Sequence, residues 1–159
     1  MVQIEEHKEG KIKGNKGQVL YDNILFDSKL EVSIYKFLRK KWLQPDYNKY
    51  SFELFEGFKP TVYFYRRGKD RKTHKNVFKP DMDKIQNISY TPDFIFDYCG
   101  WHVIIEVKGY PNERYPMVRK MFRKLLETNK NSNTIFMEIK TVKEMEQGLK
   151  ILKDNEKTI

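Results

Sequence analysis

Residues 90–109 constrain the fold more than any other stretch, because they predict two adjacent strands joined by a tight turn. Thr91–Tyr98 and Trp101–Val107 are rich in aromatic and β-branched residues, which favour strands. Between them, Cys99-Gly100 supplies a glycine of the kind that two-residue hairpin turns use. The sequence therefore predicts a β-hairpin at the centre of the domain.

The position of the turn decides which side chains share a face of this hairpin. Directly opposed residues point to the same face, so a turn at residues 99–100 places Asp93 opposite Glu106. Lys108, two residues beyond Glu106, lies on that face as well. The opposite face is expected to be apolar and to consist of Phe94, Phe96, Val103, Ile105 and Val107.

Two opposed carboxylates repel one another, and a cation between them would remove the repulsion. Carboxylate oxygens suit Mg²⁺, with Mn²⁺ as a substitute. Asp93 and Glu106 are thus candidate ligands for one or two metal ions, with the Val107 carbonyl as an additional ligand. Lys108 would place an ammonium beside the metal, where it could orient a water. The alternative is a surface hairpin with an incidental salt bridge.

A helix is expected to begin just after Ser28, since Ser28 and Glu31 have the spacing of a capping box. Leu30, Ile34, Phe37, Leu38 and Trp42 would form its apolar stripe. Glu31 completes the cap on this interpretation. It also lies at the margin of the buried face, so a second role in the metal site remains open.

The segments Tyr90-Thr91-Pro92-Asp93-Phe94 and Ile105-Glu106-Val107-Lys108-Gly109 resemble the phage endonuclease I group, the junction-resolving enzymes of the PD-(D/E)xK nuclease superfamily. The resemblance covers about residues 26–139, and Phe26–Glu31 is similar to the segment that supplies a glutamate to the metal site in that group. It implies an α/β fold with a mixed central sheet flanked by helices.

The resemblance also implies an activity. Glu31, Asp93, Glu106 and Lys108 would be the catalytic residues of a Mg²⁺-dependent endonuclease that resolves branched DNA such as four-way junctions. Such enzymes work as homodimers, each site cutting one strand. Between Glu31 and Asp93 lie more residues than in a compact member, with the surplus at residues 59–88. Insertions on a scaffold are tolerated, so the metal site is expected to be retained.

The charge of the chain favours a polyanionic partner. Its 159 residues include 31 Lys and Arg against 22 Asp and Glu, a net charge of +9 and a pI of about 9.4. Nucleic acid is the first candidate for such a partner. The candidate DNA contacts lie in an N-terminal arm, a basic segment and one helix, and they are Lys11, Lys13, Lys16, Arg66, Arg67, Arg71, Lys72, Arg119, Lys120 and Arg123.

The length predicts one nuclease domain over residues 18–153, between a flexible basic arm at 1–17 and a frayed tail at 154–159. Strands are expected at residues 50–55, 61–65 and 133–139, an insertion loop at 66–80, and helices at 116–126 and 141–152. A single cysteine and the lack of an apolar leader predict a reducing cytoplasm, the host's if a phage encodes the chain.

Two alternatives stay open at this point. The chain could be a nuclease of the same fold that acts on single-stranded or replication-fork DNA. It could instead be a non-catalytic DNA-binding protein on a nuclease scaffold, although an intact set of Asp93, Glu106 and Lys108 argues for catalysis.

Overall fold

The computed structural model describes residues 17–109, 113–129 and 132–156. The predicted basic segment at the N-terminus, with Lys11, Lys13 and Lys16, lies outside this range. The described residues form two compact units. Unit 1 contains residues 17–47, 93–109 and 133–156, and unit 2 contains residues 48–92, 113–129 and 132.

Unit 1 is built on a mixed four-stranded sheet in the order β10-β9-β8-β3. The central strand β9 (Trp101–Val107) pairs in parallel with β10 (Thr134–Ile139) and antiparallel with β8 (Phe94–Tyr98). A short edge strand, β3 (Asp46–Tyr47), pairs antiparallel with β8. The expectation of an α/β domain with a mixed central sheet is confirmed, and the described residues contain three helices.

The hairpin of β8 and β9 has the predicted register. Tyr98 pairs with Trp101 and Phe94 with Ile105. Cys99 and Gly100 both have positive φ, 50° and 73°, as a two-residue turn of this hand requires. The turn therefore determines the faces, and Asp93 and Glu106 lie on the side opposite the apolar set.

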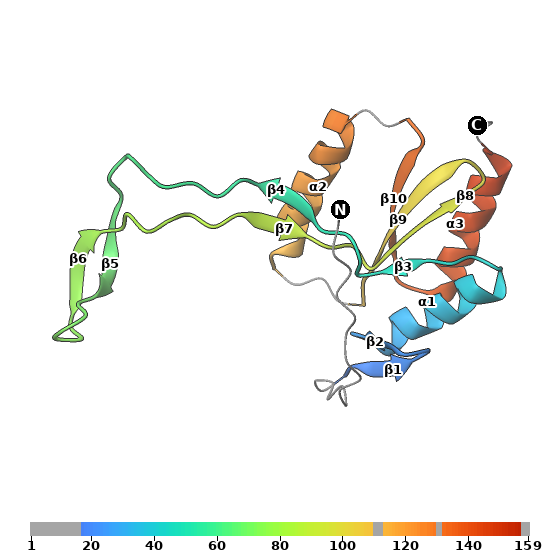
Figure 1. Cartoon of the computed structure of the whole chain (residues 1–159), viewed down its shortest axis with the longest axis horizontal. Coiled ribbons are helices and arrows are strands. Elements are labelled where there is room, and N and C mark those ends of the chain that lie inside the picture. Colours follow the sequence, from blue (N-terminus) through green and yellow to red (C-terminus); the bar gives the residue numbers. More distant parts are fainter. Residues whose placement is uncertain (1–16, 110–112, 130–131, 157–159) are drawn as a thin grey trace, which may run out of the picture. The chain divides into compact units, whose positions relative to one another are not determined.

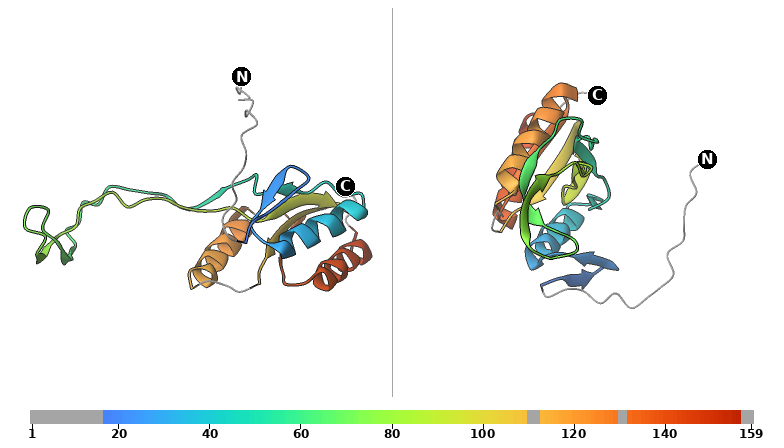
Figure 2. Two further views of the ribbon diagram at one scale, coloured as in Figure 1. Left: turned by 90° about the horizontal axis from the view of Figure 1, so that it is seen from below. Right: turned by 90° about the vertical axis from the view of Figure 1, so that its left-hand side faces the viewer.

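The apolar face of the sheet packs against α1 (Lys29–Lys40) and α3 (Val142–Asp154), which lie on the same side of it (Figure 2). Phe94, Val103 and Ile105 are fully buried there. Burying a side chain of this size stabilises a fold by about 1.5–3 kcal/mol. A charged residue at position 103 would therefore disrupt the core that holds β9 in place.

The start of α1 agrees with its capping prediction, but its apolar stripe ends earlier than expected. Ser28 is the N-cap, and its hydroxyl accepts the Glu31 N–H at 3.2 Å. The helix ends at Lys40, and Trp42 follows with a positive φ of 63° and 94% exposure. Assigning Trp42 to the apolar stripe was wrong, because the chain turns away before that residue. The small hairpin of β1 (Val19–Tyr21) and β2 (Ile24–Phe26) precedes the helix.

Unit 2 has a small aromatic core. Strands β4 (Phe52–Phe55) and β7 (Ile88–Tyr90) pair antiparallel, and α2 (Tyr115–Asn129) packs on β4. The Phe122 ring lies 5.1 Å from Phe52 and 4.7 Å from Tyr90, centroid to centroid. Phe122 is fully buried, so it is the anchor of this unit.

A two-stranded ribbon, here called the arm, extends from β4 and β7 and comprises residues 56–87 (Figure 1). At its end β5 (Tyr65–Lys69) pairs antiparallel with β6 (Asn76–Pro80). The insertion loop expected at 66–80 is therefore a hairpin. The Asp70 carboxylate accepts hydrogen bonds from the Lys72 and Thr73 N–H groups and so stabilises the turn between the two strands. A search for alternating apolar residues does not detect a turn of this kind.

The strand predicted at residues 61–65 was also wrong. Only Tyr65 belongs to a strand, and Val62, Tyr63 and Phe64 are 79%, 70% and 61% exposed. Their β-forming side chains have no sheet face to cover at this point of the arm. Among the residues that the structure describes, no helix is both long and apolar enough to cross a membrane.

Candidate active site

Asp93 and Glu106 meet at the end of the β8–β9 ladder. Asp93 precedes β8 by one residue, and its Oδ2 accepts the backbone N–H of Val107 at 2.6 Å. Glu106, the neighbour of Val107 in β9, is only 4% exposed. The next backbone N–H, that of Lys108, bonds to the carbonyl of Ile139 in β10. Since successive peptide groups of a strand point to opposite sides, the Val107 carbonyl faces the Asp93 side.

Lys108 forms the ion pair of the site. Its Nζ lies 2.6 Å from Glu106 Oε1, and its side chain is 21% exposed. The two side chains point to the same face because they are two residues apart in an extended segment. The lysine therefore neutralises part of the buried negative charge, which two carboxylates on one face would otherwise concentrate.

Asp93 is in an environment that opposes its ionisation. Burial raises the pKa of Asp93 to about 8, and the nearby Glu106 carboxylate adds to the increase. The Val107 N–H and Lys108 lower the pKa, but by less. Glu31 contributes a further increase, so its carboxylate is within electrostatic range of Asp93. A cation placed here would favour the ionised form of Asp93.

Glu31 is the second buried acid, at 5% exposure, and it approaches from the first turn of α1. Its carboxylate accepts three hydrogen bonds: from Ser28 Oγ at 2.6 Å, Tyr47 Oη at 2.7 Å and the Asp27 N–H at 3.0 Å. The capping role is therefore confirmed. A role in binding metal stays a prediction, for which the electrostatic coupling to Asp93 is the support.

The tyrosine of this network was not predicted. Tyr47 donates its hydroxyl proton to Glu31 and accepts the Asp27 N–H at 3.0 Å. Burial and the hydrogen bond to Glu31 raise the pKa of the Tyr47 hydroxyl, so it remains a donor. The ring packs 4.4 Å from Phe26 and 5.3 Å from Phe94. The two-residue strand β3 that carries it has no sequence signal of its own.

Helix α3 repeats the capping arrangement without the rest of the site. Thr141 Oγ1 accepts the Glu144 N–H at 3.1 Å, and Glu144 Oε2 accepts the Lys140 N–H at 2.6 Å. Glu144 thus makes the backbone contacts that Glu31 makes, but it is only partly buried. This second cap is an internal control for what capping alone requires.

The donor set suits a hard divalent cation. Asp93, Glu106 and Glu31 carry carboxylate oxygens, and the Val107 carbonyl points toward Asp93. Within the described ranges, no three acidic, histidine or cysteine side chains converge closely enough to count as a preformed metal-binding group. The acids are instead held by Val107, Lys108 and Tyr47, whose contacts a cation would replace or share.

The predicted DNA contacts that the structure describes lie in unit 2, in the hairpin of β5 and β6 and on α2. Arg66 and Arg67 lie in β5, Arg71 and Lys72 follow in the turn, and all four are exposed. Arg66 is paired with Asp81. The remaining candidates lie on α2 and are Arg119, Lys120 and Arg123.

Comparison with known proteins gives one finding. The family model described as "Protein of unknown function (DUF1064)" matches residues 11–150 of the chain. No curated protein and no solved structure matches the chain. The matched range includes all four candidate catalytic residues.

Proposed function

The chain belongs to the DUF1064 family, and we propose that it is a metal-dependent endonuclease that hydrolyses DNA phosphodiesters. One observation carries the proposal: two acids and a lysine share one face at the end of the β8–β9 ladder, where Glu106 is buried and the pKa of Asp93 is raised. We further propose that the fold is of the PD-(D/E)xK type, which the mixed sheet and the Asp93, Glu106 and Lys108 arrangement support.

A bound metal is consistent with the energetic cost of this arrangement. The ionised form of Asp93 is disfavoured in a metal-free fold because burial raises the pKa of its carboxyl, and groups with a shifted pKa concentrate at functional sites. Asp93 and Glu106 would hold Mg²⁺ or Mn²⁺, with Glu31 and the Val107 carbonyl completing the ligands. When bound, the metal would polarise the phosphate and lower the pKa of a bound water.

The residues around the metal would each have a distinct role. Lys108 contacts the Glu106 carboxylate that would hold the metal, so its ammonium lies where it could hold a phosphate oxygen or the attacking water. The Val107 N–H orients Asp93 through a short hydrogen bond. Tyr47 orients Glu31 and prevents its carboxylate from rotating. These positioning contacts are present before substrate binds.

We propose branched DNA, such as a four-way junction, as the substrate, cut by a homodimer. The resemblance of Tyr90–Phe94 and Ile105–Gly109 to junction-resolving enzymes supports this. So does the basic character of the arm, since a junction is recognised by shape through its phosphates. A same-fold nuclease acting on single strands or forks is the alternative, and the exposed aromatic residues of the arm favour it.

The proposal is tested by incubating the protein with a four-way junction, a matched duplex and a matched single strand, in Mg²⁺ or in EDTA. We expect cleavage in Mg²⁺ and none in EDTA, and the junction should be cut faster than the duplex or the single strand. Asp93→Asn and Glu106→Gln should each abolish cleavage while DNA affinity stays within about threefold. A non-catalytic DNA-binding protein would bind all three substrates and cut none of them, and that result would reject the proposed function.

A further inference from the structure

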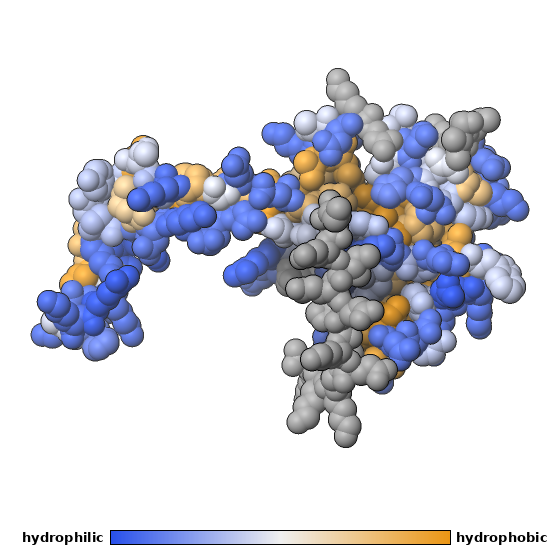
Figure 3. Space-filling view, viewed as in Figure 1, coloured by the Kyte–Doolittle hydropathy of each residue, from blue (hydrophilic) through white to orange (hydrophobic). Residues whose placement is uncertain are grey.

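The end of the arm exposes three aromatic rings in a row. Tyr63, Tyr65 and Phe78 are 70%, 50% and 76% exposed. Tyr65 lies 6.5 Å from Tyr63 and 5.6 Å from Phe78, centroid to centroid, and both pairs of rings are within 29° of parallel. Exposed apolar groups that gather in one place mark interaction sites, whereas isolated ones do not. Figure 3 shows hydrophobic residues exposed on the arm beside hydrophilic ones.

The register of β5 and β6 places Tyr65 and Phe78 on one face of the hairpin, and the Tyr63 ring stacks on Tyr65. Tyr65 and Arg67 are two residues apart, and Arg67 is directly opposite Phe78. An arginine therefore lies within the aromatic face. Arg66 and its partner Lys79 point to the other face.

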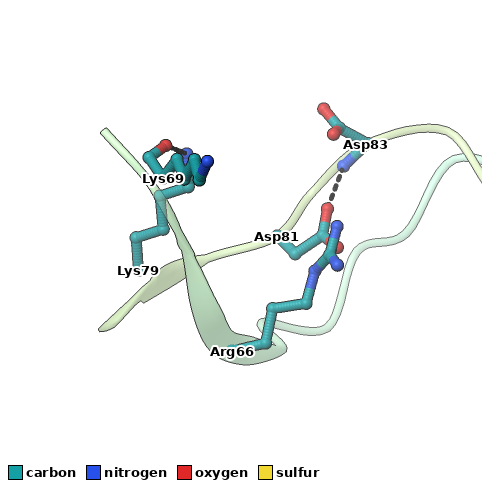
Figure 4. Close-up of polar contacts among 5 residues, drawn as sticks. All are labelled: Arg66, Lys69, Lys79, Asp81 and Asp83. Atoms are coloured by element: carbon teal, nitrogen blue, oxygen red, sulfur yellow. Dashed lines mark hydrogen bonds and ion pairs between the residues drawn. The ribbon is translucent and has the colours of Figure 1, made fainter. Parts of the chain in front are cut away.

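Internal contacts hold the side chains on the other face of the hairpin in place (Figure 4). Arg66 is paired with Asp81, whose carboxylate also accepts the Asp83 N–H at 3.2 Å. Lys79 Nζ donates to the Lys69 carbonyl at 2.8 Å. These contacts hold the hairpin in shape, so the aromatic face does not depend on a partner for its geometry.

The charge of the hairpin selects the class of partner. Residues 65–80 contain seven Lys and Arg and one acid, Asp70. A second copy of this hairpin would repel the first. Flat rings beside cations, with the cations able to follow a phosphate chain, are the combination that binds unpaired nucleotides.

We propose that the arm is a binding site for single-stranded nucleic acid, in which bases stack on Tyr63, Tyr65 and Phe78 and Arg67 contacts the phosphates. The inference rests on the proposed function for the view that nucleic acid is the ligand, and it adds a substrate class: DNA that presents unpaired bases. Stacking is insensitive to base identity, so the site reads strandedness rather than sequence.

The test measures binding in EDTA, where no cleavage occurs, by fluorescence anisotropy with a 20-nucleotide oligo-dT, the matching oligo-U and a duplex of equal length. Replacing Tyr63, Tyr65 and Phe78 together with leucine should weaken oligo-dT binding at least tenfold. Loss of one stacked base alone corresponds to a weakening of about fivefold to 160-fold. Duplex affinity should change by less than threefold.

Matched variants separate stacking from simple loss of structure. Tyr63→Phe with Tyr65→Phe keeps the rings and should retain single-strand affinity. Trp42→Leu removes an exposed aromatic outside the arm and should have no effect. Arg67→Gln should weaken binding more than Arg66→Gln, since Arg66 is held by Asp81. The ratio of oligo-dT to oligo-U affinity identifies whether DNA or RNA is preferred.

Three results would overturn the inference. Equal weakening of single-strand and duplex binding by the leucine variant would mean that the rings only stabilise the hairpin. A change in oligomeric state would identify a second copy as the partner, and loss of binding to vesicles of anionic phospholipid would identify a membrane surface. A protein that binds oligo-dT through these rings but never cuts DNA would refute the nuclease and leave this site intact.

Discussion

Replacing Asp93 with asparagine should stabilise the metal-free protein. The pKa of Asp93 is about 8 in the folded chain against 3.8 for an ordinary aspartate. Between these values the folded protein holds a proton that the unfolded chain has released, so stability falls as the pH rises through this window. Each pH unit costs about 1.4 kcal/mol. At pH 7 the upper bound on this loss of folding stability is about 4 kcal/mol, and the partial exposure of Asp93 reduces the loss to about 2 kcal/mol.

Asparagine removes this penalty and keeps the contact. Its side-chain oxygen can accept the Val107 N–H as Asp93 does, and its amide can donate to Glu106. We therefore expect Asp93→Asn to raise the free energy of unfolding by about 2 kcal/mol at pH 7 and by almost nothing at pH 4. The assay is urea unfolding followed by far-UV circular dichroism in EDTA at pH 4, 5.5, 7 and 8.5.

The control is Asp97→Asn in the same strand. Asp97 is 84% exposed and pairs with His102 at 2.8 Å, so its replacement should change stability by less than about 0.5 kcal/mol. Mg²⁺ at a hundred times its dissociation constant should stabilise the wild type by about 2.7 kcal/mol and the Asp93 variant by much less. A variant that is less stable than wild type at pH 7, or a gain independent of pH, would refute the reasoning.

Three further predictions concern activity. Glu31→Gln should lose most cleavage activity with little change in melting temperature. Glu144→Gln alters the equivalent cap of α3 and should leave cleavage unchanged. If the two variants behave alike in both assays, Glu31 acts only as a helix cap. Lys108→Ala should abolish cleavage and leave Mg²⁺ affinity, measured by calorimetry, equal or tighter, since the lysine competes for Glu106; weaker metal binding would mean a structural role. Tyr47→Phe should lower cleavage about tenfold in a kinetic assay by removing one hydrogen bond to Glu31, and an unchanged rate would dismiss it as a positioning residue.

The local pattern of the sequence was sufficient to predict the site hairpin. A two-residue turn at Cys99-Gly100 leaves only one register, and side-chain alternation then determines the faces of Asp93, Glu106 and Lys108. Capping at Ser28 is equally local, since it depends on two residues that are three apart. These features could be predicted because each is decided within a few residues.

The contacts that could not be predicted depend on tertiary structure. Tyr47 reaches Glu31 because two residues pair with β8 at the edge of the sheet, and no periodicity indicates a strand of that length. The strand prediction within the arm failed for a different reason. Residues 62–64 have strand-forming side chains, but a strand also needs a neighbouring strand at hydrogen-bonding distance. The direct contact of Lys108 with Glu106 follows from burial that spacing alone does not reveal.

The contact between Asp93 and the Val107 amide makes one backbone proton an indicator of the whole site. At 2.6 Å the hydrogen bond is short, and its strength depends on the charge of the carboxylate that accepts it. In a ¹⁵N–¹H correlation spectrum, the Val107 resonance should lie downfield and move as Asp93 loses its proton or binds a cation. The occupancy of the carboxylates could thus be followed in solution without DNA, dye or substitution, from one cross-peak of the unaltered chain.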